Sequence, residues 1–278
     1  MYVATPNSES CCCCMNGSLT RQSSMPAWRS LPPWLQTIGV EAYGGNASQL
    51  AVAIASTKAP TLLTRECTTL RLVEPPGDNS MVRLQWQRGG IYGLAKLSHA
   101  ANGTVVDIGA NIGAISLTLA RCHPTLRIIA CEPSPVTYFY LLWNCVLNGV
   151  PVRVAMPSHP RPRTAGGIDA LNVAVSRDGE STVTLSFDAT HTQDTVLDSM
   201  VSRDVQVLGC GRSKGGGKCL PFRRSVVVPA IDLPLYLHHI HVPTIELLKV
   251  DCEGCWATGL QKWPLRERTD PASLQVAN

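Results

Sequence analysis

Residues 105–113 read VVDIGANIG, and this stretch decides the fold. Thr104–Ile108 is a largely apolar, β-branched run, which predicts a buried strand. A glycine-rich turn follows it, and Ala114–Arg121 has the apolar spacing of a helix. Glycines let a backbone approach a ligand closely, and a helix N-terminus offers unpaired N–H groups. The stretch therefore predicts a strand, a ligand-binding turn and a helix in succession.

The pattern continues towards the C-terminus. Arg127–Cys131 predicts a second buried strand, Val136–Leu147 an aromatic-rich helix and Val152–Ala155 a third strand. Further strands are predicted at Val82–Gln87, Leu171–Val175, Thr182–Phe187, Val226–Ala230 and Ile245–Val250. Strands that alternate with helices at this spacing indicate βαβ units. We therefore predict a Rossmann-like α/β domain with a mostly parallel sheet.

A nucleoside cofactor is predicted at the turn. Glu132 closes the second strand, where a carboxylate can accept hydrogen bonds from ribose hydroxyls. The dinucleotide fingerprint needs glycine at two positions that hold Asn111 and Ala114 here. Asp107 would repel a pyrophosphate, but it suits the cationic amino group of S-adenosylmethionine. The alternative is a glycine turn that only packs and binds no ligand.

A second candidate site lies near the C-terminus. Residues 247–254 read LLKVDCEG, an apolar strand that ends in Asp251 and Glu253. Ligands of open α/β sheets bind beyond the carboxyl ends of the strands, where both acids would lie. Solvated acids in a strand-end turn are the alternative interpretation.

Three blocks of the sequence resemble FkbM-family methyltransferases and occur in the same order. They are VVDIGANIGAISLTLA at 105–120, ACEPSPVTYFYLLWNCVLNG at 130–149 and ELLKVDCEG at 246–254. LNVAVSRDGESTVTL at 171–185 and VPAIDLPL at 228–235 also resemble segments of that family. The resemblance covers roughly residues 80–278.

The resemblance implies a class I methyltransferase fold, S-adenosylmethionine as the methyl donor and a hydroxyl acceptor on a sugar or other small molecule or glycan. It implies a cofactor loop that contains Asp107, Gly109, Asn111 and Gly113. It places Glu132 at the ribose and Asn172 through Ala174 near the adenine. It places Lys249, Asp251, Glu253 and Gly254 at the methyl-transfer site.

The chain departs from the family pattern in two places. Cys255 and Trp256 stand where the family has a small residue and an acid. The chain also stops soon after Ser273–Ala277, the predicted fifth main strand, so the last two strands of the family fold are expected to be lacking. The unpaired edge predicts self-association.

The expected domain organisation has three parts. Residues 1–35 are a disordered tail, 36–80 an irregular N-terminal extension and 81–278 an FkbM-like methyltransferase domain that is truncated at its C-terminus. The tail loosely resembles a transit peptide, which predicts a soluble cytoplasmic or organellar protein without deciding the compartment.

Composition excludes several classes of function. A net charge of +4 without a basic stripe argues against a nucleic-acid partner, and no apolar run of 18 residues predicts a membrane span. The twelve cysteines are expected to be reduced, and no metal site is expected among them. A divalent cation at the strand-end acids stays open, as do two other functions, a nicotinamide-dependent oxidoreductase and a non-catalytic binding remnant.

Overall fold

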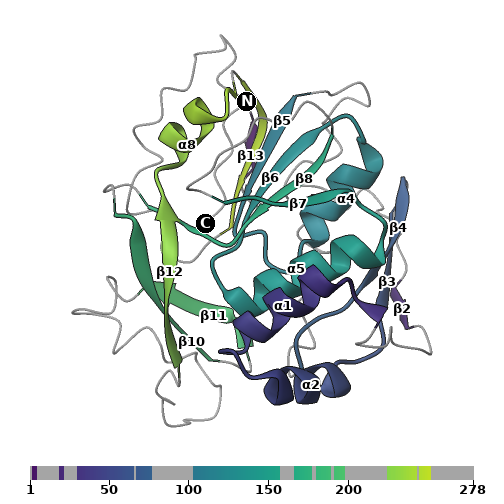
Figure 1. Cartoon of the computed structure of the whole chain (residues 1–278). Helices are drawn as coiled ribbons and strands as arrows, with labels where there is room; N and C mark the ends of the chain where they lie inside the picture. Colours follow the sequence, from purple (N-terminus) through teal and green to yellow (C-terminus); the bar gives the residue numbers. More distant parts are fainter. Residues whose placement is uncertain are drawn as a thin grey trace, which may run out of the picture.

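The centre of the molecule is a six-stranded sheet in which every neighbouring pair is parallel. The computed structural model describes residues 2–4, 19–21, 30–65, 67–76, 103–156, 166–176, 180–188, 191–197, 224–242 and 244–251. The strands, in spatial order, are β1 (Tyr2–Ala4), β13 (Ile245–Val250), β5 (Thr104–Ile108), β6 (Arg127–Cys131), β8 (Gly167–Leu171) and β7 (Val152–Val154). The predicted α/β fold with a mostly parallel sheet is confirmed (Figure 1).

Helices cover both faces of this sheet. On one face lie α4 (Ala114–Cys122) and α5 (Pro135–Leu147), and α1 (Pro33–Ala42) packs against α5 (Figure 1). On the other face lies α8 (Leu233–His239), whose apolar side chains join the cluster that lines that side of the sheet. Because side chains alternate along a strand, Val105 joins the core under α4 and α5 while Val106 joins the core under α8. Both faces are buried, which explains the nearly continuous apolar sequence of β5 and β6.

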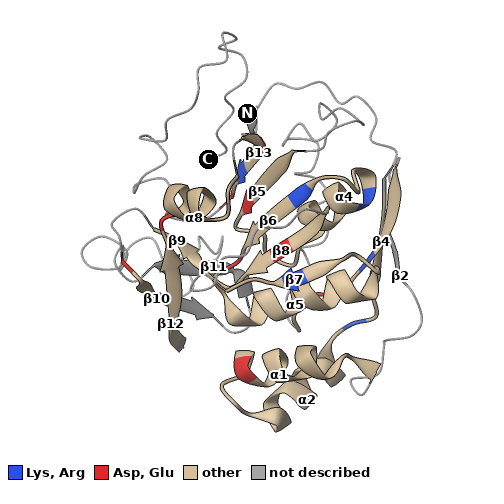
Figure 2. Ribbon diagram, turned by 45° about the horizontal axis from the view of Figure 1, so that its top comes forward, with Lys and Arg blue, Asp and Glu red and all other residues tan. Residues whose placement is uncertain are grey.

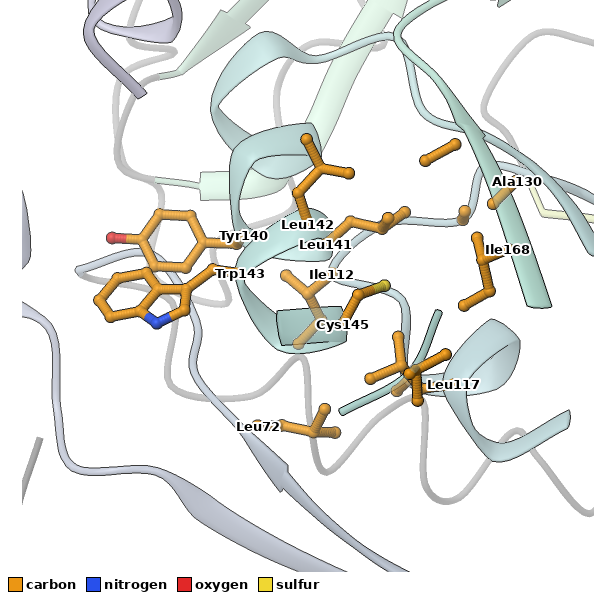
Figure 3. Close-up of a cluster of buried hydrophobic side chains, with 14 of the residues drawn as sticks. Leu72, Ile112, Leu117, Ala130, Tyr140, Leu141, Leu142, Trp143, Cys145 and Ile168 are labelled. Atoms are coloured by element: carbon orange, nitrogen blue, oxygen red, sulfur yellow. The ribbon is translucent and has the colours of Figure 1, made fainter. Parts of the chain in front are cut away.

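The larger core is built around α5. Figure 3 shows its side chains Tyr140, Leu141, Leu142, Trp143 and Cys145 beside residues of the sheet and of α4. Phe139, Tyr140 and Trp143 are fully buried, and their ring centroids lie 5.3–5.7 Å apart. Such contacts stabilise a core beyond simple area burial, and they hold α5 rigidly behind the β5–α4 turn.

The third central strand differs from the prediction. The sequence predicts strands at Val152–Ala155 and Leu171–Val175, whereas β8 (Gly167–Leu171) lies next to β6 and β7 forms the edge beyond it. Asp169 interrupts the apolar pattern of β8 although it is completely buried. Its carboxylate is bonded by Arg127 Nε at 3.1 Å and Arg153 Nε at 2.9 Å, which makes burial of the charge tolerable.

The segment before residue 80 is more regular than predicted. It contains α1, α2 (Ala47–Ser56), β3 (Thr61–Arg65) and β4 (Thr68–Leu72). Strands β1 and β2 (Leu19–Arg21) also lie in the stretch predicted to be a disordered tail. Strands β2, β3 and β4 form a small antiparallel sheet.

Two asparagines, one in α5 and one just after it, attach this segment to the main domain. The Asn144 side chain accepts a bond from the Val73 amide at 2.8 Å and donates to the Val73 carbonyl at 3.0 Å. Asn148 bonds Arg71 in the same two-way manner, at 2.7 Å in each direction. These contacts are 71 and 77 residues apart in sequence, which is why no local pattern predicts them.

A disulfide joins the same two parts of the molecule. Cys67, just before β4, is bonded to Cys122, the last residue of α4. The expectation that the cysteines are all reduced was therefore wrong for this pair. Cys131 and Cys145 are buried free thiols, as the sequence predicts.

A second sheet lies beside the first (Figure 1). It has the order β11-β10-β12-β9 and consists of β9 (Ala174–Val175), β10 (Thr182–Asp188), β11 (His191–Leu197) and β12 (Arg224–Ile231). Strand β11 was not predicted, while β10 and β12 match predicted strands within two residues.

The edge of the main sheet next to β13 is occupied by β1, in register from Tyr2 opposite Leu247 to Ala4 opposite Lys249. The predicted strands Val82–Gln87 and Ser273–Ala277 lie outside the described residues. Among the described helices, none is long and apolar enough to cross a membrane.

Candidate functional site

The carboxyl ends of the central strands gather the predicted site residues at one edge of the sheet. The turn at 109–113 follows β5, Glu132 follows β6, Asn172 follows β8 and Asp251 follows β13. Backbone bonds tie these ends together, since the Asp251 amide donates to the Ile108 carbonyl and the Glu132 amide donates to the Leu171 carbonyl, both at 3.0 Å. Asp251, half-buried, therefore lies directly beside the glycine turn.

The backbone amides of the turn are used inside the protein. Those of Gly109 and Ala110 both donate to the carbonyl oxygen of Cys131 at 3.0 Å. The Asn111 amide donates to Glu132 Oε2 at 2.8 Å. The amides of Ile112 and Gly113 donate to Asn111 Oδ1 at 2.7 Å and to the Ala110 carbonyl at 3.0 Å. The turn thus offers none of these five N–H groups to a phosphate.

Three residues of the turn have left-handed backbones: Gly109 (φ 72), Asn111 (φ 53) and Gly113 (φ 86). A Cβ atom on Gly113 would lie 2.7 Å from Leu117 Cδ1 and 3.1 Å from Leu141 Cγ. Gly113 is therefore required by its φ angle and by the close packing of α4 on α5.

Asp107 lies beneath the turn and is fully buried. Its Oδ1 accepts a bond from Lys249 Nζ at 2.6 Å, and its Oδ2 accepts one from Ser116 Oγ at 2.6 Å. In Figure 2 the pair is visible as neighbouring blue and red segments on β13 and β5. Both carboxylate oxygens thus have partners within the protein.

Glu132 is buried at the point where the turn and β6 meet. Besides the Asn111 amide at Oε2, its Oε1 accepts the Ser134 amide at 2.9 Å. Burial raises the pKa of Glu132 to about 7, while these two amide bonds and the nearby Lys249 partly oppose that rise. A carboxylate oxygen can accept more than one hydrogen bond, so both oxygens keep acceptor capacity for a ligand.

The two residues predicted near an adenine have different surroundings. Asn172 stays at the site, where its Nδ2 donates to the carbonyls of Glu132 at 2.8 Å and Pro133 at 2.9 Å. Ala174 lies in β9, paired with Ala230, and its side chain belongs to the apolar cluster of the second sheet.

Lys249 lies at the site, whereas Glu253 and Gly254 lie outside the described residues. Lys249 is buried, with only 1% of its surface exposed. Within the described ranges, no group of three or more His, Cys, Asp or Glu side chains is arranged to hold a metal ion.

Two supporting residues escaped the sequence analysis. Ser116 bonds Asp107, and Asn144 Nδ2 donates to the Ile112 carbonyl of the turn at 2.9 Å. Asn144 could have been identified from its position among the aromatic and apolar residues of α5, because a buried amide needs hydrogen-bond partners.

A family model described as the methyltransferase FkbM domain matches residues 107–268, more than half of the 278-residue chain. A methyltransferase of Sordaria araneosa, sdnD, is 46% identical over 57 residues, which are 20% of this chain and 21% of that protein. The matched segment thus spans about a fifth of the length of this curated relative.

Among solved structures, M. jannaschii TYW2 in complex with AdoMet is similar at 19% identity and a TM-score of 0.26. The match covers 61% of this chain and 84% of that one. A similarity of this size has no bearing on the site.

Proposed function

The chain belongs to the methyltransferase FkbM domain family, and from that premise we propose that it transfers a methyl group from S-adenosylmethionine to a hydroxyl oxygen. The acceptor class that we propose is a sugar or another small molecule or glycan, and not a nucleic acid. We also propose that the methyltransferase domain spans residues 81–278, which contain the matched range 107–268.

One observation carries the choice of cofactor: the turn has no amide donor left for a phosphate. All five amides from Gly109 to Gly113 donate to protein acceptors. Dinucleotide sites depend on such amides to bind the pyrophosphate. This supports a phosphate-free nucleoside cofactor over the nicotinamide alternative.

The charges at the strand ends fit a cationic cofactor. Glu132 and Asp251 are carboxylates at this edge, whereas the charge of Asp107 is paired with Lys249. In the proposed arrangement Glu132 accepts hydrogen bonds from the ribose hydroxyls, with the turn at Gly109 and Asn111 beside the nucleoside and Asn172 beside the adenine. Asp107 and Gly113 fix the turn through their contacts with α4 and α5. Ala174 follows Asn172 in the chain and lies in β9 of the second sheet.

S-adenosylmethionine, when bound, supplies a methyl group attached to a positively charged sulfur. The contribution of the chain is to position the two reactants and to remove the proton of the acceptor hydroxyl. Asp251 is a half-buried carboxylate adjacent to the turn, and we propose that Asp251 or Glu253 accepts that proton.

Calorimetric titration tests the cofactor proposal. We expect the wild type to bind S-adenosylmethionine and S-adenosylhomocysteine but not NAD. Glu132→Gln should weaken both nucleosides by about 1.5–3 kcal/mol, the range for hydrogen bonds to a charged group. Glu41→Gln, an exposed glutamate on α1, is the matched control and should bind normally. Binding of NAD alone would contradict the proposal.

Turnover tests the acceptor side. Hydroxylated acceptors are incubated with methyl-labelled donor, and the acceptor that gains label is used for kinetics. We expect Asp251→Asn or Glu253→Gln to lower kcat more than cofactor affinity. A variant that turns over at the wild-type rate excludes that residue as the proton acceptor.

We propose that the chain self-associates through an exposed sheet edge, which the sequence places at the strand predicted for Ser273–Ala277. Among the described strands, β13 would present such an edge if β1, which pairs with it over three residues, left it.

A further inference from the structure

The ammonium group of Lys249 is enclosed by the turn. Its Nζ lies 2.6 Å from Asp107 Oδ1 and 2.8 Å from the carbonyl oxygen of Gly109. The side chain is 2% exposed. An ammonium group in this position is bonded to the inner side of the turn and is shielded from solvent.

The Gly109 contact determines the orientation of one peptide unit. The peptide between Gly109 and Ala110 is held at its carbonyl by Lys249 and at its N–H by the carbonyl of Cys131, 3.0 Å away. A glycine with φ 72 can turn its peptide over at little steric cost. Two bonds at opposite ends of the unit oppose such a flip.

Backbone pairing alone does not supply this restraint. Strands β13 and β5 are in register through Lys249 opposite Asp107 and Val250 opposite Ile108. That ladder stops at the end of β5, and the turn begins at Gly109. The Lys249 side chain extends the connection of β13 beyond the ladder and into the turn.

Asp107 in turn fixes the lysine. It accepts a hydrogen bond from Lys249 Nζ on one oxygen and from Ser116 Oγ of α4 on the other, so the ion pair is linked to β5, α4 and the turn. A buried lysine without such a partner would be strongly destabilising. The carboxylate of Asp107 therefore holds the Lys249 ammonium in place, and the ammonium holds the carbonyl of Gly109.

We propose that Lys249 is a positioning residue that locks the Gly109–Ala110 peptide in the orientation required for cofactor binding, and that it takes no part in proton transfer. This inference rests on the proposed function only for the cofactor; the locking of the peptide is a property of the free protein.

Three variants separate locking from charge balance. Lys249→Met removes the donor and leaves Asp107 with a buried, unpaired charge. Lys249→Met combined with Asp107→Asn removes both charges and should restore much of the melting temperature. Asp107→Asn alone leaves the Lys249 ammonium buried without its carboxylate and should lower the melting temperature. Lys58→Met, an exposed lysine after α2, is the matched control.

Hydrogen exchange on the free, full-length chain is the first measurement. We expect faster exchange of the amides at 109–111 in Lys249→Met and in the double variant, while amides of α5 exchange as in the wild type. In Lys58→Met the turn should stay slow. Slow exchange at the turn in the double variant would overturn the proposal.

Titration with S-adenosylhomocysteine is the second measurement. The double variant should bind at least about tenfold more weakly than the wild type even where its melting temperature has recovered, since one charged donor is missing. Recovery of affinity together with melting temperature would show that Lys249 only balances charge, and would overturn the inference. A wild type that binds no nucleoside would contradict the proposed function, while the exchange experiment would still decide the locking of the peptide.

Discussion

At the scale of single residues, Glu132 should make cofactor binding depend on pH. A ribose hydroxyl donates to the ionised carboxylate, and burial raises the pKa of this group to about 7, so its protonation should change across the neutral pH range. Binding at lower pH requires loss of a proton, and affinity for S-adenosylhomocysteine should fall about tenfold between pH 8 and pH 6. Calorimetry at pH 6, 7 and 8 measures this.

The contribution of Glu132 to the stability of the fold should depend on pH in the opposite direction. A carboxyl whose pKa is higher in the folded state than in the unfolded chain stabilises the fold fully below its unfolded pKa. That contribution is lost as pH rises through about 7. Glu132→Gln should remove both dependences; a pH profile of affinity in that variant identical to the wild type would assign the linkage to another group.

The sequence predicted which residues lie at the strand ends of the candidate site, but not the partners of their side chains. The strand–turn–helix pattern located Asp107 and the turn, and the end of the next strand located Glu132. The ion pair of Asp107 could not be predicted, because its partner Lys249 is 142 residues away in the sequence. Ala174 lies in β9, and its side chain packs in the apolar cluster of the second sheet, which the sequence did not predict.

At the scale of secondary structure elements, Gly113→Ala should destabilise the packing of α4 on α5. The left-handed backbone alone costs a non-glycine residue roughly 1–2 kcal/mol, and over-packing adds about 1–3 kcal/mol. Urea unfolding measures the sum. Gly45→Ala is the matched control, because Gly45 has φ 77 and nothing within 4 Å of the added Cβ. Equal losses in the two variants would show that the contacts with Leu117 and Leu141 do not matter.

The disulfide gives a second prediction at this scale. Cys67 and Cys122 are 55 residues apart, and closing such a loop stabilises the folded state by about 4 kcal/mol in the chain-entropy model. Cys67→Ser, or reduction of the wild type, should lower the free energy of unfolding accordingly. Reductant should have no further effect on Cys67→Ser, and a wild type insensitive to reductant would mean that the bond does not form.

Elements with a strong local pattern were predicted well, and those held by distant contacts were not. β5, α4, β6 and α5 match their predictions within one residue. β8 was displaced in the prediction because Asp169 looks incompatible with a buried strand until Arg127 and Arg153 are known to meet it. The helices and strands before residue 80 were missed in part because α5 and its flanking asparagines hold them.

At the scale of the whole molecule, the sheet edge at β13 should control self-association. An open edge presents unpaired N–H and C=O groups to other chains. Deletion of residues 1–8, which removes β1, should therefore produce dimers or larger species that increase with concentration. Size-exclusion chromatography with light scattering compares the deletion with the full chain. Identical mass distributions across the concentration range would show that the edge is closed by other means.

The ion pair between Lys249 and Asp107 also has a consequence for how the chain is synthesised. Asp107 leaves the ribosome 142 residues before its cation. During that interval β5, β6 and β8 can assemble only with an uncompensated carboxylate at their centre, or else stay open. Contacts of such high sequence separation form late and slowly. A nascent chain arrested before Lys249 should therefore be readily cleaved by protease, and protection should appear abruptly once β13 has emerged.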